Sequence, residues 1–328
     1  MGMTIAFVGS SGHIGYALDP ALAGNDFSRF VLAPGSADDN MTGIYNLCVK
    51  NGKDVKQYDD WRDILKNEKP DVLVNCTVCA YMAEITVAFF KAGAHVFCEK
   101  PLARTLEELD AVEAAWRKSG KVLLAMLPFR YEAGFRAAYR AIKDGVIGEV
   151  RLLNAQKSYK LGQRASYYWD QKIYGGTIPW VGAHAIDFIR FLSGEHFVSA
   201  AAWNSAKCNG GQGDLDVSAV CAFQMTNGVT ATATMDYFRP ANAPTHGDDR
   251  VRAVGSEGII EVVDGVATLT KNGKEILADV EVPSIFEDFM TQMRGGAPLL
   301  LTASESLENA RACLGARTAA ERGEVYHF

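Results

Sequence analysis

Two short segments of the sequence carry side chains that can hold or transfer a proton. In the first, Glu99-Lys100-Pro101 follows an apolar run, and a lysine at a strand end can hydrogen-bond an oxygen that gains negative charge. In the second, His184 and Asp187 are three residues apart and would share one helix face, where a carboxylate can orient an imidazole. The alternatives are a solvated strand-end lysine and a helix-start histidine with local hydrogen bonds.

A glycine-rich turn comes directly after the first strand-like run, TIAFVG. Glycines let the backbone approach a pyrophosphate, whose charge is then met by N–H groups at the start of a helix. The spacing departs from G-x-G-x-x-G, and a plain strand-to-helix turn is the alternative. The turn supplies the first candidates for contact with a dinucleotide, namely Gly9, Ser10, Ser11, Gly12, His13 and Ile14.

The end of the second strand should decide between NAD and NADP, because an acidic residue there bonds the ribose and an arginine favours the 2′-phosphate. The segment reads Ala33-Pro34-Gly35-Ser36 and has neither. Ser36 can meet the ribose, and Asp38 or Asp39 can reach back. Both cofactors stay open.

Strand and helix patterns alternate from residue 3 to about 125, which is typical of a parallel sheet with helices on both faces. Residues 105–120 form the clearest helix, with Thr105 and Glu108 at capping-box spacing and Gly120 at the end. Longer alternating runs follow, and Asn227-Gly228 predicts a hairpin. We therefore expect an α/β protein with a Rossmann-type domain over 1–125 and an α+β domain over 126–328. The last helix, within 304–323, is able to pack back on the first domain.

The segment HVFCEKPLA, with AEITVAFFKAGAHV before it and TLEELDAVEAA after it, resembles the Gfo/Idh/MocA oxidoreductase family. The segment YGGTIPWVGAHAIDFIRFLSG continues the resemblance. The family implies a doubly wound Rossmann sheet and a second domain with a large, mainly antiparallel open sheet. It also implies that the bond before Pro101 is often cis, that Lys100, His184 and Asp187 are catalytic, and that Glu99 and Lys100 lie at the cofactor.

Several positions depart from the family pattern. Trp180 stands where the family has the aspartate of its proton relay, and it is either a stacking surface for a ring or part of the core. Thr77 alone remains of one cofactor motif, and Arg130 remains of the motif after the sixth strand. The resemblance thus adds Thr77 to the cofactor candidates and gives as substrate candidates Arg130, Lys157, Tyr159, Lys160, Trp180 and His184. For Lys157, Tyr159 and Lys160, a polar sheet face or a subunit contact is the alternative.

The expected activity is hydride transfer between NAD or NADP and a secondary alcohol or ketone of a sugar, inositol or glycoside. A cofactor-retaining enzyme that cleaves glycosides through transient oxidation, and a non-catalytic ligand sensor, are the alternatives. The net charge of −6 argues against nucleic acid and anionic membranes as partners. No metal site is expected. Seven scattered cysteines and the absence of a signal-like or spanning segment favour a soluble cytoplasmic protein. The open sheet of the family favours a homodimer or homotetramer.

Overall fold

The structure is a computed structural model that describes residues 2–328. Its internal contacts divide the chain into two units. The first unit runs to Met126 and includes Pro283–Leu307, and the second comprises Leu127–Val282 and Glu308–Phe328. Sequence reasoning had assigned 283–307 to the second domain. Phe286 and Phe289 explain the difference, because both rings pack on Phe97 at 5.4 Å between centroids.

The first unit is built on a parallel six-stranded sheet in the order β3-β2-β1-β4-β5-β6. The order reverses beside β1, whose neighbours are β2 and β4. Open α/β sheets bind ligands at such a switch point, outside the carboxyl ends of the strands. The strands are β1 (Met3–Val8), β2 (Phe27–Ala33), β3 (Asp54–Gln57), β4 (Val72–Asn75), β5 (His95–Cys98) and β6 (Leu123–Ala125).

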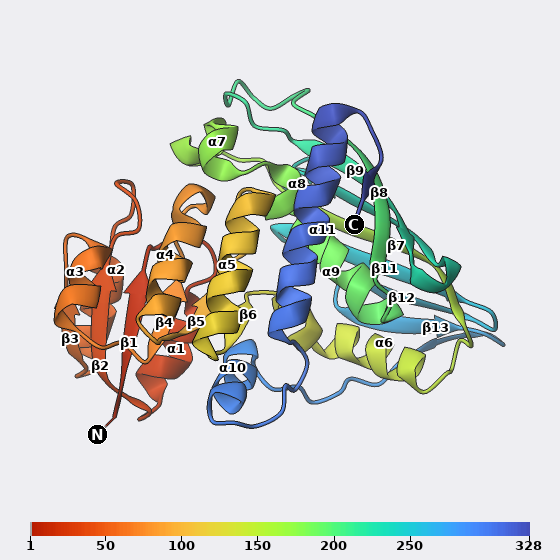
Figure 1. The fold of residues 1–328 in the computed structure, drawn as a ribbon. Coiled ribbons are helices and arrows are strands. Elements are labelled where there is room, and N and C mark those ends of the chain that lie inside the picture. The colour runs from red at the N-terminus through yellow and green to blue at the C-terminus, as the bar shows by residue number, and fades with distance from the viewer. Residues whose placement is uncertain (1) are drawn as a thin grey trace. The chain divides into compact units, whose positions relative to one another are not determined.

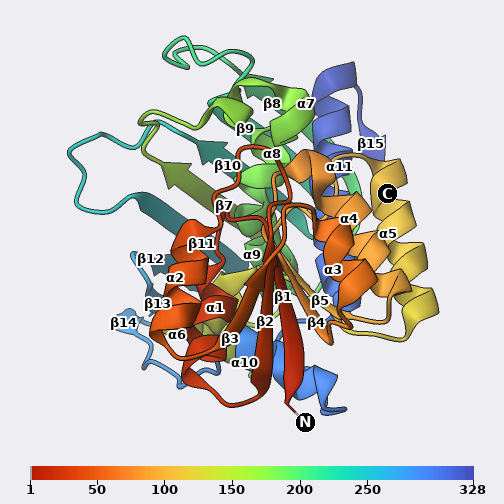
Figure 2. The same ribbon diagram turned by 90° about the vertical axis from the view of Figure 1, so that its left-hand side faces the viewer.

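Helices cover both faces of this sheet, with α1 and α2 on one side and α3 to α5 on the other (Figure 2). β4 and β5 are almost wholly buried, as expected for strands with helices on both faces. α10 packs against α1 and β5. The helices are α1 (Gly15–Ala23), α2 (Thr42–Lys50), α3 (Trp61–Asn67), α4 (Cys79–Lys91), α5 (Leu106–Ser119) and α10 (Ile285–Met293).

The second unit is built on a nine-stranded sheet in the order β14-β13-β12-β11-β7-β10-β9-β8-β15. The β7–β10 pair is parallel and the other pairs are antiparallel. The strands are β7 (Val150–Tyr159), β8 (Phe197–Ser205), β9 (Ser218–Met225), β10 (Thr230–Asp236), β11 (Gly247–Gly255), β12 (Ile259–Val263), β13 (Val266–Thr270), β14 (Lys274–Ile276) and β15 (Tyr326–His327).

One face of this sheet carries the helices of the unit (Figure 1). α9 lies on β7, β10 and β11, and α6 lies on β12 and β13. The other face exposes apolar side chains, among them Trp203 and Val220. The helical segments are η1 (Pro128–Tyr131), α6 (Ala133–Lys143), η2 (Ser166–Trp169), α7 (Gln171–Tyr174), α8 (Thr177–Trp180), α9 (Gly182–Ser193), η3 (Thr226–Gly228) and α11 (Ala303–Arg322).

Local sequence signals account for several boundaries. The Thr105 hydroxyl accepts from the Glu108 N–H at 3.1 Å at the start of α5, and Gly120 ends the helix with φ 63°. Asn227 and Gly228 adopt φ 55° and 76° between the paired strands β9 and β10. The predicted fold class is confirmed. Among the described residues, no helix has the length and apolarity to cross a membrane.

Candidate functional site

The glycine-rich turn joins β1 to α1 and brings two glycines against neighbouring chain. A Cβ on Gly9 would lie 2.5 Å from backbone atoms of Cys76 and Thr77, and one on Gly12 would lie 2.2 Å from Oε2 of Glu99. Both glycines have positive φ, at 84° and 66°. The structure gives no acceptor within residues 2–328 to the backbone N–H groups of Gly12 and Ile14. Two such N–H groups at the start of a helix suit a pyrophosphate.

The Glu99 carboxylate connects this turn to Lys100. Its Oε2 accepts from the backbone N–H of His13 at 2.6 Å and lies 2.7 Å from His13 Nδ1, and its Oε1 accepts from the Lys100 N–H at 2.9 Å. Burial by itself raises the pKa of Glu99, but the charges of His13 and Lys100 and the bonds from His13 outweigh it and hold the pKa at about 2. Glu99 is therefore an ionised, buried link between turn and lysine.

Lys100 follows β5 at the carboxyl edge of the parallel sheet, and its bond to Pro101 is cis, as the family resemblance implies. Its Nζ lies 3.9 Å from Glu99 Oε1. The residue is buried, so its side chain has little freedom. An ammonium group held in this way can polarise an oxygen without first being ordered.

Asp39 accepts hydrogen bonds from the backbone of two loops, while the ribose contact that the sequence allowed stays a prediction. Its Oδ1 accepts from the Ser10 N–H at 2.8 Å, and its Oδ2 accepts from the Ser36 N–H at 2.8 Å and from the Gly35 N–H at 3.1 Å. Asp39 thus ties the loop after β2 to the glycine-rich turn. The buried hydroxyl of Thr77 has no hydrogen-bond partner in the described residues, and a Cβ on Gly35 would lie 2.3 Å from it.

A cavity of about 360 Å³ lies beside this loop in the first unit. Its charged lining consists of Asp59, Asp60 and Glu84 against the single cation Arg62. Arg62 is already paired with Glu84 at 2.6 Å and stacks on Trp61 at 4.3 Å. The remaining lining residues are Pro34, Gly35, Ser36, Ala37 and Tyr81. The cavity thus contains Ser36, a predicted cofactor residue, and it has an excess of carboxylates.

In the second unit, His184 lies in the first turn of α9. Gly182 lets this turn approach β10, since a Cβ there would lie 2.9 Å from the Met235 side chain. His184 is 1% exposed, and its imidazole packs in a T-shaped arrangement with the Phe129 ring, at 5.1 Å between centroids. Asp187, one turn further on, forms a charge pair with Arg130, with contacts of 2.7 to 3.1 Å from two guanidinium nitrogens.

Arg130 and Asp187 are both buried, and a buried pair of this kind is strongly destabilised when one partner is removed. This geometry supports a structural role under α9. Orientation of His184 by Asp187, and substrate binding by Arg130, stay predictions.

Lys157 lies beside Phe129 and carries perturbed electrostatics. Its Nζ is 4.2 Å from the Phe129 ring centroid and 4.6 Å from that of Tyr159, and it pairs with Asp249. Burial lowers the pKa of Lys157 and raises that of Asp249. Glu132 keeps an exposed surface, yet desolvation of its carboxyl and the charge of Asp249 raise its pKa to about 7. Groups perturbed in this way often cluster at functional sites.

A series of side-chain contacts connects His184, through Phe129 and Lys157, with Trp180, which lies one turn earlier in the chain. Tyr159 stacks with Tyr237 at 6.2 Å, Arg164 lies over Tyr237 at 4.5 Å and over Tyr168 at 5.6 Å, and Tyr168 meets Trp180 at 5.8 Å. We call this set the aromatic cluster of the second unit. It comprises His184, Phe129, Lys157, Tyr159, Tyr237, Arg164, Tyr168 and Trp180. Trp180 is buried and also contacts Tyr167 and Tyr174. These contacts agree with the alternative that Trp180 is part of the core. Stacking of Trp180 on a ligand stays a prediction.

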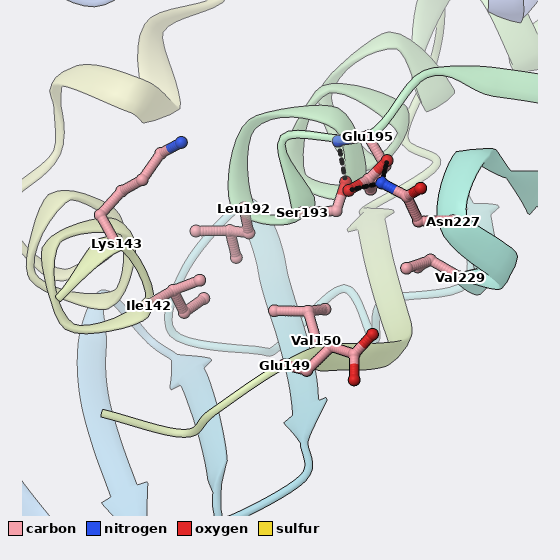
Figure 3. A pocket seen from close by; sticks show the side chains of 9 residues that line it. All are labelled: Ile142, Lys143, Glu149, Val150, Leu192, Ser193, Glu195, Asn227 and Val229. Atoms are coloured by element: carbon pink, nitrogen blue, oxygen red, sulfur yellow. Dashed lines mark hydrogen bonds between the residues drawn. The ribbon is translucent and has the colours of Figure 1, made fainter. Parts of the chain in front are cut away.

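A larger cavity, of about 480 Å³, lies at the other end of α9 (Figure 3). Leu192 and Ser193 at the helix C-terminus, Val150 at the start of β7 and Asn227 of the hairpin line it. None of the predicted site residues is among its lining residues. His184 lies at the N-terminal end of α9 and Tyr159 at the far end of β7, so size alone does not identify the functional site.

The predicted residues fall into two groups, one in each unit. The first unit brings Gly12, His13, Glu99 and Lys100 together. In the second unit, His184, Tyr159 and Trp180 belong to the aromatic cluster. Lys160 follows Tyr159, and its Nζ donates to the Ala243 carbonyl. Among the described residues, no three His, Cys, Asp or Glu side chains gather in a way that could hold a metal ion.

Sequence reasoning missed Arg164, Phe129, Tyr237 and the acidic cavity at Arg62. The predicted candidates Lys157 and Tyr159 share the helix-covered face of β7 with Leu153 and Ala155, as strand alternation requires. Arg164 and Phe129 lie outside the strands, and no periodic pattern places them.

Comparison with known proteins agrees with these observations. The model described as "Oxidoreductase family, NAD-binding Rossmann fold" matches residues 3–126, and the Gfo/Idh/MocA C-terminal domain model matches residues 135–261. A solved structure from Thermotoga maritima, described as an oxidoreductase, is 38% identical with a TM-score of 0.94, over 99% of this chain and 100% of that one.

Two further relatives are more distant. Myo-inositol 2-dehydrogenase of Thermotoga maritima is 27% identical over 62% of this chain and 60% of its own length. A levoglucosan dehydrogenase in complex with NADH and L-sorbose has the same fold at 19% identity, with a TM-score of 0.81 over 100% of this chain and 99% of that one. The chain spans about three fifths of the length of the first curated relative that it matches. By its two domain matches and its 38% identical neighbour, this chain is a member of the Gfo/Idh/MocA oxidoreductase family, with an NAD-binding Rossmann domain.

Proposed function

We propose that this protein is an NAD-dependent dehydrogenase that oxidises a secondary alcohol of a sugar, inositol or glycoside, or reduces the corresponding ketone. The observation that carries the proposal is the Glu99 carboxylate, which binds His13 of the glycine-rich turn and the N–H of Lys100. It couples a dinucleotide cradle to a cation suited to a reacting oxygen. The relatives that act on inositol and levoglucosan support the substrate class.

The first unit holds the cofactor. The N–H groups of Gly12 and Ile14 bind the pyrophosphate, and Ser10, Ser11, Ser36 and Thr77 contact the rest of the dinucleotide. A bound nicotinamide would supply the hydride acceptor for oxidation of the carbinol carbon. Lys100 hydrogen-bonds the reacting oxygen, His184 removes the hydroxyl proton, and the product is the ketone.

NAD is the preferred cofactor. The cavity beside Ser36 carries three carboxylates and one arginine that is already paired. The 2′-phosphate of NADP adds negative charge, which such a lining repels.

The protein forms a homo-oligomer through the open face of the nine-stranded sheet. Trp203, 65% exposed on β8, lies opposite Val220 on β9. A cavity of about 550 Å³ hollows the same sheet between Leu152 and Ala222. Exposed apolar surface of this kind favours association. All seven cysteines are free thiols, which supports a cytoplasmic location.

Absorbance of reduced nicotinamide, measured with NAD⁺ and NADP⁺ across sugars, inositols and glycosides, tests the activity, while chromatography follows the product. We expect NADH to form with the wild type and to be lost in Lys100→Ala and His184→Ala. Cleaved glycoside without net NADH would instead support the cofactor-retaining mechanism. Cofactor binding without any product would support the sensor.

A further inference from the structure

Two cations of the second unit, Lys160 and Arg164, have no carboxylate partner within residues 2–328. Arg164 belongs to the aromatic cluster, and Lys160 follows its member Tyr159. Lys160 Nζ donates to the carbonyl of Ala243, and the Arg164 guanidinium donates to the carbonyl of Lys160. Neither forms an ion pair in the described chain, and the buried Nε of Arg164 has no hydrogen-bond partner there. Both residues are half-buried. A half-buried arginine without a counter-ion suits an anionic ligand, because its guanidinium can bind two oxygens of that ligand.

Arg164 is held in place rather than free to swing into water. Its guanidinium carbon lies 4.5 Å from the Tyr237 centroid and 5.6 Å from that of Tyr168, and its backbone N–H donates to Gln212 at 2.9 Å. Tyr237 is in turn held by a 2.7 Å bond between its hydroxyl and that of Tyr174. The planar group is thus pre-ordered, which reduces the entropy lost when it binds.

Other cations on this part of the sheet have carboxylate partners. Lys157 pairs with Asp249, and Arg239 and Arg250 both pair with Asp248. Lys160 and Arg164 therefore leave an excess of positive charge. His246, which stacks on Tyr159 at 5.0 Å, responds to it: burial lowers its pKa, and Arg164, Lys160 and Lys157 lower it further.

We propose that the substrate is an anion, a sugar- or polyol-derived carboxylate or phosphate, whose charged group binds Arg164 and Lys160. This inference rests on the proposed function, because it assigns the charge of the same substrate. A guanidinium matches two oxygens of a carboxylate or phosphate at once, and the ammonium of Lys160 adds a third donor. A neutral polyol would leave both cations without a counter-charge.

Binding and turnover test the inference separately. Titration calorimetry in the presence of NADH compares glucuronate, gluconate and glucose 6-phosphate with glucose, and an inositol phosphate with myo-inositol. We expect at least one anion to bind about 10- to 100-fold more tightly than its neutral counterpart, the range for hydrogen bonds to charged groups. Preference for the carboxylates or for the phosphates identifies which anion the site takes.

Substitutions test whether Arg164 and Lys160 cause the preference for anions. Arg164→Gln and Lys160→Gln should each remove most of the preference, and Arg164→Lys should restore only part of it, because lysine keeps the charge without the planar fork. Lys207→Gln, which removes a positive charge from an exposed turn, is the matched control and should keep the preference. Thermal melts check that each variant is folded. If Arg164→Gln unfolds the protein, Lys160→Gln carries the test.

Equal binding of anions and neutral compounds, unchanged by the variants, would overturn the inference while leaving the dehydrogenase intact if neutral polyols still reduce NAD⁺. Failure of every probe to bind would overturn it as well. Anion binding that depends on Arg164, without reduction of NAD⁺ by any compound, would support the anion site and contradict the dehydrogenase.

Discussion

Replacing Glu99 by glutamine removes a buried charge that links the glycine-rich turn to Lys100. The Glu99 pKa falls from 4.5 to about 2 in the folded protein, and each pKa unit corresponds to about 1.4 kcal/mol, so the ionised form stabilises the fold by about 3 kcal/mol. The amide of the introduced glutamine would also place its N–H donors against the backbone N–H of either His13 or Lys100. We expect Glu99→Gln to lower the free energy of unfolding at pH 7 by about 3 kcal/mol.

The pH dependence of the free energy of unfolding tests whether the ionised Glu99 carboxylate stabilises the folded protein. Because the folded-state pKa is lowered, the stabilisation is fully present above pH 4.5 and is lost as the pH falls towards about 2. Urea unfolding of both proteins between pH 7 and pH 3 should therefore show a gap that narrows as the pH falls. Glu113→Gln, which breaks a more exposed pair with Arg117, is the control and should cost about 0 to 1 kcal/mol. Equal stabilities of wild type and Glu99→Gln at pH 7 would refute the reasoning.

Four other changes test separate parts of the account. Gly12→Ala places a Cβ against Glu99 at φ 66° and should raise the Kd for NADH about tenfold or more, measured by fluorescence titration, since left-handed backbone alone costs about 1–2 kcal/mol. Arg130→Met leaves Asp187 buried without its partner and should destabilise the protein by about 3–5 kcal/mol in urea unfolding; a loss below about 1 kcal/mol would contradict a structural pair. Glu84→Lys reverses a charge in the cavity beside Ser36 and should shift the ratio of KM values towards NADP, whereas an unchanged ratio would place the 2′-phosphate elsewhere. Trp203→Glu on the open sheet face should lower the oligomer mass seen by light scattering, and an unchanged mass would exclude this face as the interface.

Local signals predicted the regular elements well where apolar spacing, caps and turns agreed. The capped helix α5 and the hairpin at Asn227 follow from short-range chemistry alone. The attachment of residues 283–307 to the first unit depends on the contacts of Phe286 and Phe289 with Phe97, which no local pattern reveals. The parallel pairing of β7 with β10 is likewise set by packing between distant segments.

In the candidate site, too, local features were predicted from the sequence and long-range contacts were not. Lys100, His184 and the glycine-rich turn were found because motif spacing reflects local geometry. The long-range contacts of the candidate residues were not predicted: Asp39 binds Ser10 across 29 residues, and Asp187 binds Arg130 across 57. Arg164 lies in a segment without a regular pattern, and its lack of a carboxylate partner within residues 2–328 becomes visible only when the neighbouring side chains are placed.

The transfer of a labelled hydride tests the central claim most directly. The protein is incubated with NAD⁺ and with perdeuterated glucose, myo-inositol and glucuronate, and mass spectrometry follows both product and cofactor. The account predicts a ketone product together with reduced cofactor that carries deuterium, and the loss of both in Lys100→Ala. Product that forms while the released cofactor stays oxidised and unlabelled would contradict it.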